Sequence, residues 1–313
     1  RHVTMLPFKL VWHPGYDLGL GAHVFPSTKY QLVHDRLLSS GFASAADFIQ
    51  PEPAPDEDVL LVHTPEWVEK LKTGTLSYYD LLKLEIPYSH QTIRAFWLAA
   101  GGTTLAARLA LRDGISINLS GGFHHAFPGH GEGFCALNDL AIAVRRLQRE
   151  GRIERAMVVD CDVHHGNGTA AIFAHDRSVF TFSMHQLNNY PMEKPPSDID
   201  IDLADETGDA DYLERLRAAL GPAIAAHRPQ LVLYAAGADP YFRDQLGGLS
   251  LTMEGLIARD RMVFAAALME HVPVAVTFAG GYSIRVEETV AIHVNTVKAA
   301  KEVLDRVGWA PRR

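Results

Sequence analysis

The fold class can be inferred from one stretch of the sequence, Ala156-Met157-Val158-Val159-Asp160-Cys161-Asp162-Val163-His164-His165. In it, an apolar run typical of a strand leads directly into a group of acidic residues and histidines. Other apolar runs end in Ser120-Gly121-Gly122-Phe123-His124-His125, in Gly237-Ala238-Asp239 and in Gly280-Gly281-Tyr282. In open parallel α/β sheets, ligands bind beyond the carboxyl ends of the strands. The polar clusters are therefore expected to meet at one edge of a sheet.

Strands and helices alternate along most of the chain. The clearest strand patterns are Ile115–Leu119, Ala156–Asp160, Val179–Ser183, Leu231–Ala235 and Val274–Phe278. Helical patterns lie at Leu137–Glu150, Asp211–His227, Thr252–His271 and Val286–Val307. This alternation predicts βαβ crossovers and a mainly parallel sheet with helices on both faces, a three-layer α/β/α fold.

The region before residue 100 is less regular. It predicts an edge strand at Leu10–Trp12 and helices at Thr28–Ser39 and Gln91–Arg112. The proline-rich run Pro51–Pro55 is interpreted as a surface loop rather than a linker. We therefore expect residues 1–313 to form a single α/β domain.

Composition limits the class of protein. Lys and Arg number 29 against 37 Asp and Glu, a net charge of −8, which argues against direct nucleic-acid binding. The two cysteines, Cys135 and Cys161, predict no disulfide framework and are interpreted as small buried residues. No apolar run approaches the roughly 20 residues of a membrane span, and the first residues lack the pattern of a signal peptide. A cytoplasmic protein is expected.

The spacing Asp160-x-Asp162-x-His164 would place three side chains on one face if the strand continued through it. Such a group is costly to bury without a cation, and its N and O donors suit Zn²⁺ or Fe²⁺ better than Ca²⁺. Asp239, after another strand, is a candidate third ligand that would leave one coordination position open. The alternatives are a helix-capping loop with a hydrogen-bonded His164 and a simple turn at Asp239 before Pro240.

The pair His124-His125 follows two glycines, so its imidazoles are expected to have different roles, one taking a proton from water and the other stabilising charge. The alternative is one core histidine beside an exposed one. Tyr282 could donate to a developing oxyanion, or it could simply pack at the rim of the sheet. The glycine-rich run 129–133 lacks the pattern of a phosphate-binding loop.

Together these segments resemble the zinc-dependent histone deacetylase family, which has the arginase–deacetylase fold. The resemblance extends from about Lys9 to Val307 and includes Gly133-Phe134-Cys135 and Asn167, and short features such as Leu246-Gly247-Gly248-Leu249-Ser250 resemble class IV members and their bacterial relatives. It implies Zn²⁺, with Fe²⁺ as an alternative, bound by Asp162, His164 and Asp239. It also implies that His125 is the general base and later the acid, beside His124.

The remaining implied roles concern residues around this centre. Asp160 would orient His124, Asn167 would face His125, Tyr282 would polarise the acyl carbonyl, and the acyl-lysine tunnel would be lined by Gly133, Phe134 and Tyr190. A structural K⁺ would bind backbone carbonyls of Asp160, Asp162, His164, Ser183 and Met184. Asn167 departs from the Asp of many members, because a neutral amide can orient His125 but cannot stabilise its charged form as a carboxylate would.

The expected reaction is hydrolysis of acyl-lysine, carrying acetyl or a longer fatty acyl group, by metal-activated water. The partner would be an acyl-lysine protein or peptide, or a small acylated amine if the enzyme is an acetylpolyamine amidohydrolase.

A two-metal ureohydrolase fits less well, because His164 stands four residues past Asp160 and Pro240 follows Asp239. A non-catalytic acyl-lysine binder would not need both histidines and Tyr282. The class IV resemblance implies a preference for long fatty-acyl chains over acetyl. Small residues at Ala235–Ala238 and Gly247-Gly248 could leave space for such a chain beyond the metal, or they could simply allow close packing of strand on helix. The oligomeric state is not predicted.

Overall fold

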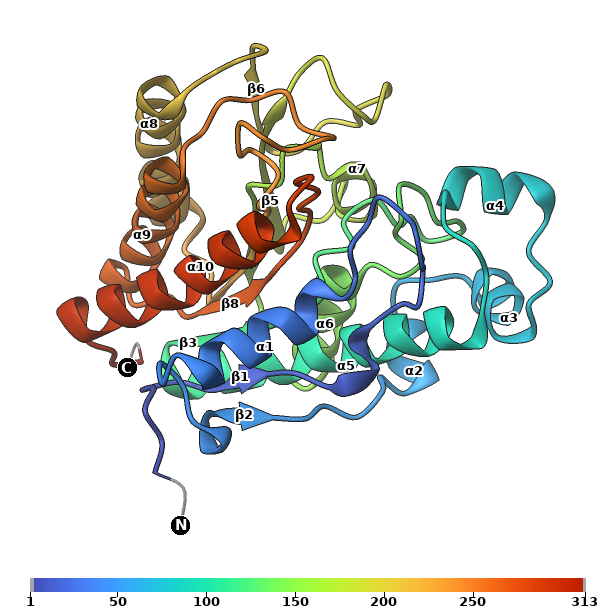
Figure 1. Ribbon diagram of the computed structural model, residues 1–313, viewed down its shortest axis with the longest axis horizontal. Coiled ribbons are helices and arrows are strands. Elements are labelled where there is room, and N and C mark those ends of the chain that lie inside the picture. Colours follow the sequence, from blue (N-terminus) through green and yellow to red (C-terminus); the bar gives the residue numbers. More distant parts are fainter. Residues whose placement is uncertain (1–2, 312–313) are drawn as a thin grey trace.

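The apolar runs pair into one parallel sheet in the computed structural model, which describes residues 3–311 (Figure 1). Its eight strands have the order β2-β1-β3-β8-β7-β4-β5-β6, and every pairing is parallel. The strands are β1 (Leu10–Val11), β2 (Phe48–Ile49), β3 (Ile115–Asn118), β4 (Ala156–Asp160), β5 (Val179–Gln186), β6 (Ile199–Leu203), β7 (Leu231–Ala235) and β8 (Val274–Thr277). The predicted parallel sheet is confirmed.

Helices cover both faces of this sheet. They are α1 (Lys29–Ser39), α2 (Asp56–Val59), α3 (Pro65–Thr73), α4 (Tyr78–Leu84), α5 (His90–Asp113), α6 (Asp139–Arg149), α7 (Asn167–Ile172), α8 (Asp209–His227), α9 (Met253–Met269) and α10 (Val286–Val307). Side chains of β4 alternate between two cores. Met157 and Val159 pack in a cluster with α8, α9 and α10, whereas Ala156 and Val158 pack in a cluster with α5 and α6. The three-layer α/β/α architecture follows from this alternation.

A further apolar cluster lies at the carboxyl ends of the strands. It joins side chains from the N-terminal part of the chain, such as Tyr16, Trp67 and Phe96, to Phe123 and Tyr282, which follow β3 and β8. Helices α3 and α4 belong to this part and lie together at the right-hand end of Figure 1. The irregular N-terminal region therefore builds the surroundings of the strand ends.

The structure corrects several expectations about the elements. β1 is not an edge strand, because β2 pairs with its outer side, and neither β2 nor β6 was predicted. β2 is only two residues long, and β6 alternates apolar residues with Asp200 and Asp202, so neither has a strong apolar run. β4 ends at Asp160, so Asp162 and His164 lie in a loop rather than on a continued strand. The short helices α2, α3, α4 and α7 were also not predicted. No helix within residues 3–311 is long and apolar enough to cross a membrane.

Candidate active site

Asp162, His164 and Asp239 converge at the carboxyl edge of the sheet. Their ligand atoms lie within 4.8 Å of one another, and all three side chains are buried. Asp162 and His164 follow β4, and Asp239 follows β7. The two strands are neighbours in the sheet, with Asp160 opposite Ala235, and this pairing brings the two loops together. The structure thus joins the predicted ligands from two distant segments.

Backbone amides hold the carboxylates in place. Asp162 accepts from the amides of His164 at 2.9 Å and Gly280 at 2.7 Å, and Asp239 Oδ1 accepts from Val163 at 2.8 Å. A Cβ at Gly280 would lie 2.1 Å from Asp239 Oδ2, so only glycine allows this approach. Asp239 Oδ2 is buried and accepts no hydrogen bond of good geometry among the described residues, and His164 Nδ1 lies 3.3 Å from it. A buried carboxylate oxygen in this state can be satisfied by a bound cation.

The imidazole of His164 completes a set of donors that fits a divalent metal. Its Nε2 lies 3.2 Å from the carbonyl oxygen of Leu246, to which it can donate. Its Nδ1 then faces Asp162 Oδ1 at 3.1 Å and Asp239 Oδ2 at 3.3 Å. Burial and the charge of Asp162 raise the pKa of Asp239 to about 7, whereas Asp162 and Asp239 outweigh burial and raise the pKa of His164 to about 10, so the carboxylates attract positive charge to this point. Two carboxylates and one imidazole suit Zn²⁺ or Fe²⁺.

The neighbouring histidines have different partners. His124 Nδ1 lies 2.5 Å from Asp160 Oδ2, and His125 Nδ1 lies 2.7 Å from Asn167 Oδ1. Burial would lower the pKa of His124, but Asp160 and Asp162 outweigh it and raise this pKa to about 9. Burial and the nearby His124 hold the pKa of His125 well below its ordinary value. At neutral pH, therefore, His124 is charged and His125 is neutral.

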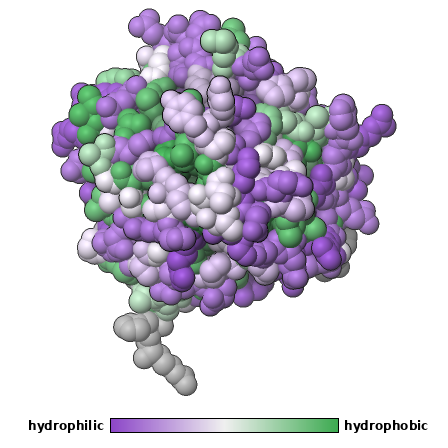
Figure 2. Space-filling view, turned by 90° about the vertical axis from the view of Figure 1, so that its right-hand side faces the viewer, coloured by the Kyte–Doolittle hydropathy of each residue, from purple (hydrophilic) through white to green (hydrophobic). Residues whose placement is uncertain are grey.

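A cavity of about 190 Å³ leads to these residues, and its lining includes His125, His164 and Tyr282. Figure 2 shows the face on which α3 and α4 lie, with a hollow near its middle that has hydrophobic side chains in its depth. Gly133, Phe134 and Tyr190 line the same cavity. The tunnel residues implied by the resemblance thus lie together around one opening.

Gly133 allows two rings to approach its backbone. Its φ is +53°, and a Cβ there would lie 2.7 Å from His125 Cδ2 and 2.8 Å from Tyr190 Cε1. The rings of His125 and Tyr190 meet edge to face, with centroids 5.0 Å apart. Any larger residue at position 133 would push apart the candidate base and the tunnel wall.

A model of the histone deacetylase domain matches residues 23–297 of the chain. The chain belongs to the histone deacetylase family. It is accordingly a hydrolase of that family, as its motifs suggested.

Individual relatives agree with this family. The chain is 30% identical over 293 residues to histone deacetylase 2 of Arabidopsis thaliana, covering 90% of this chain and 76% of that protein. It is 41% identical over 298 residues to an uncharacterized protein of Picosynechococcus sp., covering 95% and 99% of the two chains. It is 28% identical over 289 residues to the acetoin utilization protein AcuC of Staphylococcus aureus, covering 84% and 73%. The crystal structure of the HDA15 HD domain matches with a TM-score of 0.80 at 25% identity, covering 95% of both chains.

The segments implied for K⁺ in this histone deacetylase family member also lie side by side. Asp160, at the end of β4, is paired in register with Ser183 of β5, and Met184 follows. The loop of Asp162 and His164 continues from the end of β4. The pairing places all five backbone positions in one region, and K⁺ itself stays a prediction.

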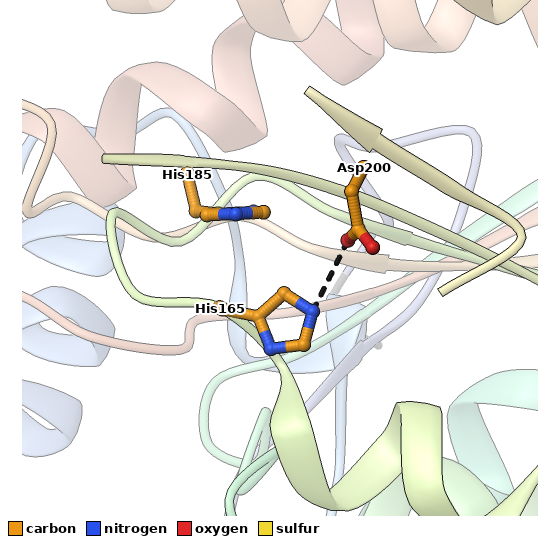
Figure 3. A group of neighbouring side chains, drawn as sticks. All are labelled: His165, His185 and Asp200. Atoms are coloured by element: carbon orange, nitrogen blue, oxygen red, sulfur yellow. Dashed lines mark hydrogen bonds and ion pairs between the residues drawn. The ribbon is translucent and has the colours of Figure 1, made fainter. Parts of the chain in front are cut away.

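His165, the residue after His164, belongs to a second group of two histidines and one carboxylate. His165, His185 and Asp200 come from the loop before α7, from β5 and from β6, and their candidate ligand atoms also lie within 4.8 Å of one another (Figure 3). His185 bonds Ser183 Oγ at 2.9 Å and Asp202 Oδ1 at 2.8 Å, and His165 Nε2 lies 3.1 Å from Asp200 Oδ1. These hydrogen bonds account for both nitrogens of His185. The group fastens the loop that carries His164 to β5 and β6.

Residues with no sequence motif also shape the site. Asp244 accepts from the amides of Tyr282, Leu246 and Gly247, and so holds the phenol-bearing loop. Lys29 is fully buried and donates to the carbonyl of Ala279 at 2.7 Å. Glu85 lines the cavity, and Glu132 accepts a hydrogen bond from Asn167. Neither residue was predicted from the sequence. The sequence could not reveal them, because their partners lie far away along the chain.

The structure bears on two predictions, one about the two cysteines and one about the small residues after β7. Cys135 and Cys161 are buried, and burial raises the pKa of Cys161 to about 12, so neither is a ready nucleophile. For the small residues after β7, the structure favours close packing over the predicted space for a long acyl chain. A Cβ at Gly237 would lie 2.7 Å from the Cα of Asp162, and one at Gly247 would lie 2.1 Å from a backbone oxygen. These residues are small because backbones pack closely.

Proposed function

We propose that this chain is a zinc-dependent lysine deacetylase of the class IV type, which hydrolyses the amide of acetyl-lysine in a protein or peptide. The observation that carries the proposal is the convergence of Asp162, His164 and Asp239 at a point where His164 lines one cavity together with His125 and Tyr282. Asp239 Oδ2, buried without a hydrogen bond of good geometry among the described residues, supports a metal at this point. A structural K⁺ at the β4–β5 carbonyls belongs to the same proposal.

The roles of the protein groups follow from their surroundings. A bound Zn²⁺ would polarise the amide carbonyl and lower the pKa of water. His125, held neutral by burial, takes a proton from the attacking water and later gives one to the departing lysine amine. His124, held charged by Asp160, stabilises negative charge beside it. Tyr282 donates its phenol hydrogen to the oxygen on which charge develops.

The size of the inner space favours acetyl over longer acyl groups. A second cavity, of only about 20 Å³, shares His125 and Tyr282 with the larger one and also touches Asp162. That volume holds about one water molecule or a methyl group. A dodecanoyl chain would have to displace packed backbone atoms. We therefore expect kcat/KM to fall as the acyl chain becomes longer.

A second candidate is an acetylpolyamine amidohydrolase, which the acidic wall of the cavity favours. Glu85 lines the cavity, and Glu132 is close enough to help raise its pKa, although burial is the larger cause. A carboxylate at this position could bind a cationic amine of a small substrate as well as an amide of a peptide.

The test is a substrate panel with the metal-reconstituted protein. We expect the highest kcat/KM on an acetyl-lysine peptide, a steady fall through octanoyl and dodecanoyl lysine, and lower values on acetylpolyamines. Elemental analysis should give one divalent metal per chain at the site. Higher kcat/KM on acetylpolyamines would favour the second candidate, and turnover of no acylated amine would refute both.

A further inference from the structure

A hydrogen-bond chain that begins at His125 continues through Asn167 to the carboxylate of Glu132. His125 Nδ1 lies 2.7 Å from Asn167 Oδ1, and Asn167 Nδ2 donates to Glu132 Oε2 at 2.9 Å. The same carboxylate accepts from Tyr190 Oη at 3.0 Å, and its Oε1 lies 2.7 Å from His130 Nε2. Asn167 is only 2% exposed, so its amide cannot turn to water instead.

The turn that carries Glu132 is itself well fixed. The amide of Cys135 donates to the Glu132 carbonyl at 2.9 Å, and the amides of Gly133 and Phe134 donate to carbonyls at the end of α4. The carboxylate therefore projects from a rigid turn whose next two residues line the cavity. Its position relative to Asn167 does not depend on a flexible loop.

Glu132 decides which end of the Asn167 amide faces His125. Burial would raise the pKa of Glu132, but its hydrogen bonds with His130, Asn167 and Tyr190 outweigh burial and lower it. An ionised carboxylate can only accept hydrogen bonds, so the NH₂ of Asn167 must point to it. The Asn167 oxygen then faces His125. Without such a partner, an asparagine side chain can present either end, because its oxygen and nitrogen have nearly the same shape.

The orientation of Asn167 in turn selects one tautomer of His125. An oxygen opposite Nδ1 requires the hydrogen on Nδ1, and in a neutral imidazole the lone pair is then on Nε2. We propose that Glu132 is a positioning residue that acts through Asn167 to hold His125 in the tautomer whose Nε2 can accept a proton. The proposal rests on the deacetylase function proposed above, in which His125 is the base.

A purely structural role for Glu132 is the alternative, because the residue also binds Tyr190 and His130. The variant Asn167→Asp separates the two. Both oxygens of an aspartate accept, so His125 keeps its hydrogen on Nδ1 whatever stands at position 132. Glu132→Gln should then harm the enzyme only when residue 167 is asparagine. A structural role would be lost equally in both backgrounds.

The experiment measures the tautomer directly by ¹⁵N NMR of histidine-labelled protein, with the His125 signals assigned by their absence in His125→Ala. We expect one tautomer, with the hydrogen on Nδ1, in the wild type and a mixture of tautomers in Glu132→Gln. The kcat of Glu132→Gln should fall about tenfold, with KM changed less, as expected for a lost hydrogen bond to a charged group. Added to Asn167→Asp, the same substitution should no longer lower kcat. Glu154→Gln, at an exposed residue before the amino end of β4, is the matched control.

Two results would overturn the inference. One is a single tautomer with the hydrogen on Nδ1 in Glu132→Gln. The other is an equal loss of kcat when Glu132→Gln is made in the wild type and in the Asn167→Asp variant. Because the NMR measurement needs no substrate, it tests the inference even if no acyl-lysine is hydrolysed. Failure of the proposed function and failure of this inference are therefore distinguishable.

Discussion

Asp244 links the candidate oxyanion donor to a metal ligand, so Asp244→Asn is a sharp test of how the site is held. Its Oδ2 accepts from the amide of Tyr282 at 2.7 Å, and its Oδ1 accepts from the amides of Leu246 and Gly247 at 2.9 and 3.0 Å. The carbonyl of Leu246 faces His164 Nε2 at 3.2 Å. One carboxylate thus positions both Tyr282 and the loop behind His164.

The magnitude follows from counting these bonds. An asparagine has one oxygen, which can keep either the Tyr282 bond or the two loop bonds, and its NH₂ then faces the remaining amide. At least one bond to a charged group is lost, worth about 1.5–3 kcal/mol, and the remaining bonds become neutral. We expect the free energy of unfolding to fall by about 2–4 kcal/mol. We expect kcat to fall by about tenfold or more, and by no more than the 10²–10³ of a fully lost oxyanion donor.

The assay compares kcat, KM and urea unfolding of wild type and variant at pH 8. Burial raises the pKa of Asp244 to about 6, and at pH 8 the wild-type carboxylate is ionised. Asp209→Asn is the control, because Asp209 accepts from the amide and hydroxyl of Thr252 at the start of α9, outside the site. It should lose stability without losing kcat. Wild-type kcat in Asp244→Asn would show that Asp244 does not position Tyr282.

Three other outcomes are expected. Asp239→Ala should lose the bound metal and turnover together, because two ligands remain; two equivalents of Mn²⁺ per wild-type chain by elemental analysis would contradict this site. Tyr282→Phe should lower kcat by about 10²–10³ with KM changed much less, and an unchanged kcat would remove the phenol from the mechanism. Glu150→Gln should lower the free energy of unfolding at pH 7 by about 1 kcal/mol after allowing for solvent screening. Its hydrogen bond with Arg108, helped by Arg146, lowers the pKa of Glu150 from 4.5 to about 2. That stabilisation is present above pH 4.5 and disappears as the pH falls towards 2, so denaturation curves that still differ at pH 2 would contradict it.

Much of the sheet could be predicted from local patterns. The central strands β4, β7 and β8 are buried on both faces, so their nearly continuous apolar runs are distinct from the helices between them. The edges could not be predicted in the same way. β2 has two residues and β6 alternates isoleucine with exposed aspartate, and their pairing depends on neighbours from other parts of the chain.

Local sequence patterns suffice to predict which chemical groups the site contains. Acidic residues, histidines and a tyrosine directly after apolar strands predict where ligands gather, because parallel strands end at one edge. Their residue types and order also sufficed for the family. This information is local, since each motif carries its meaning within a few residues.

The partners that give these residues their properties become visible only in the folded chain. Glu132 lies 35 residues from Asn167, and Asp244 lies 38 residues from Tyr282, and no local pattern indicated a role for either residue. The end of strand β4 at Asp160 and the close packing at Gly237 likewise depend on contacts between loops. Hydrogen bonding and burial depend on distance in space, and the chain brings these distant groups together only when it folds.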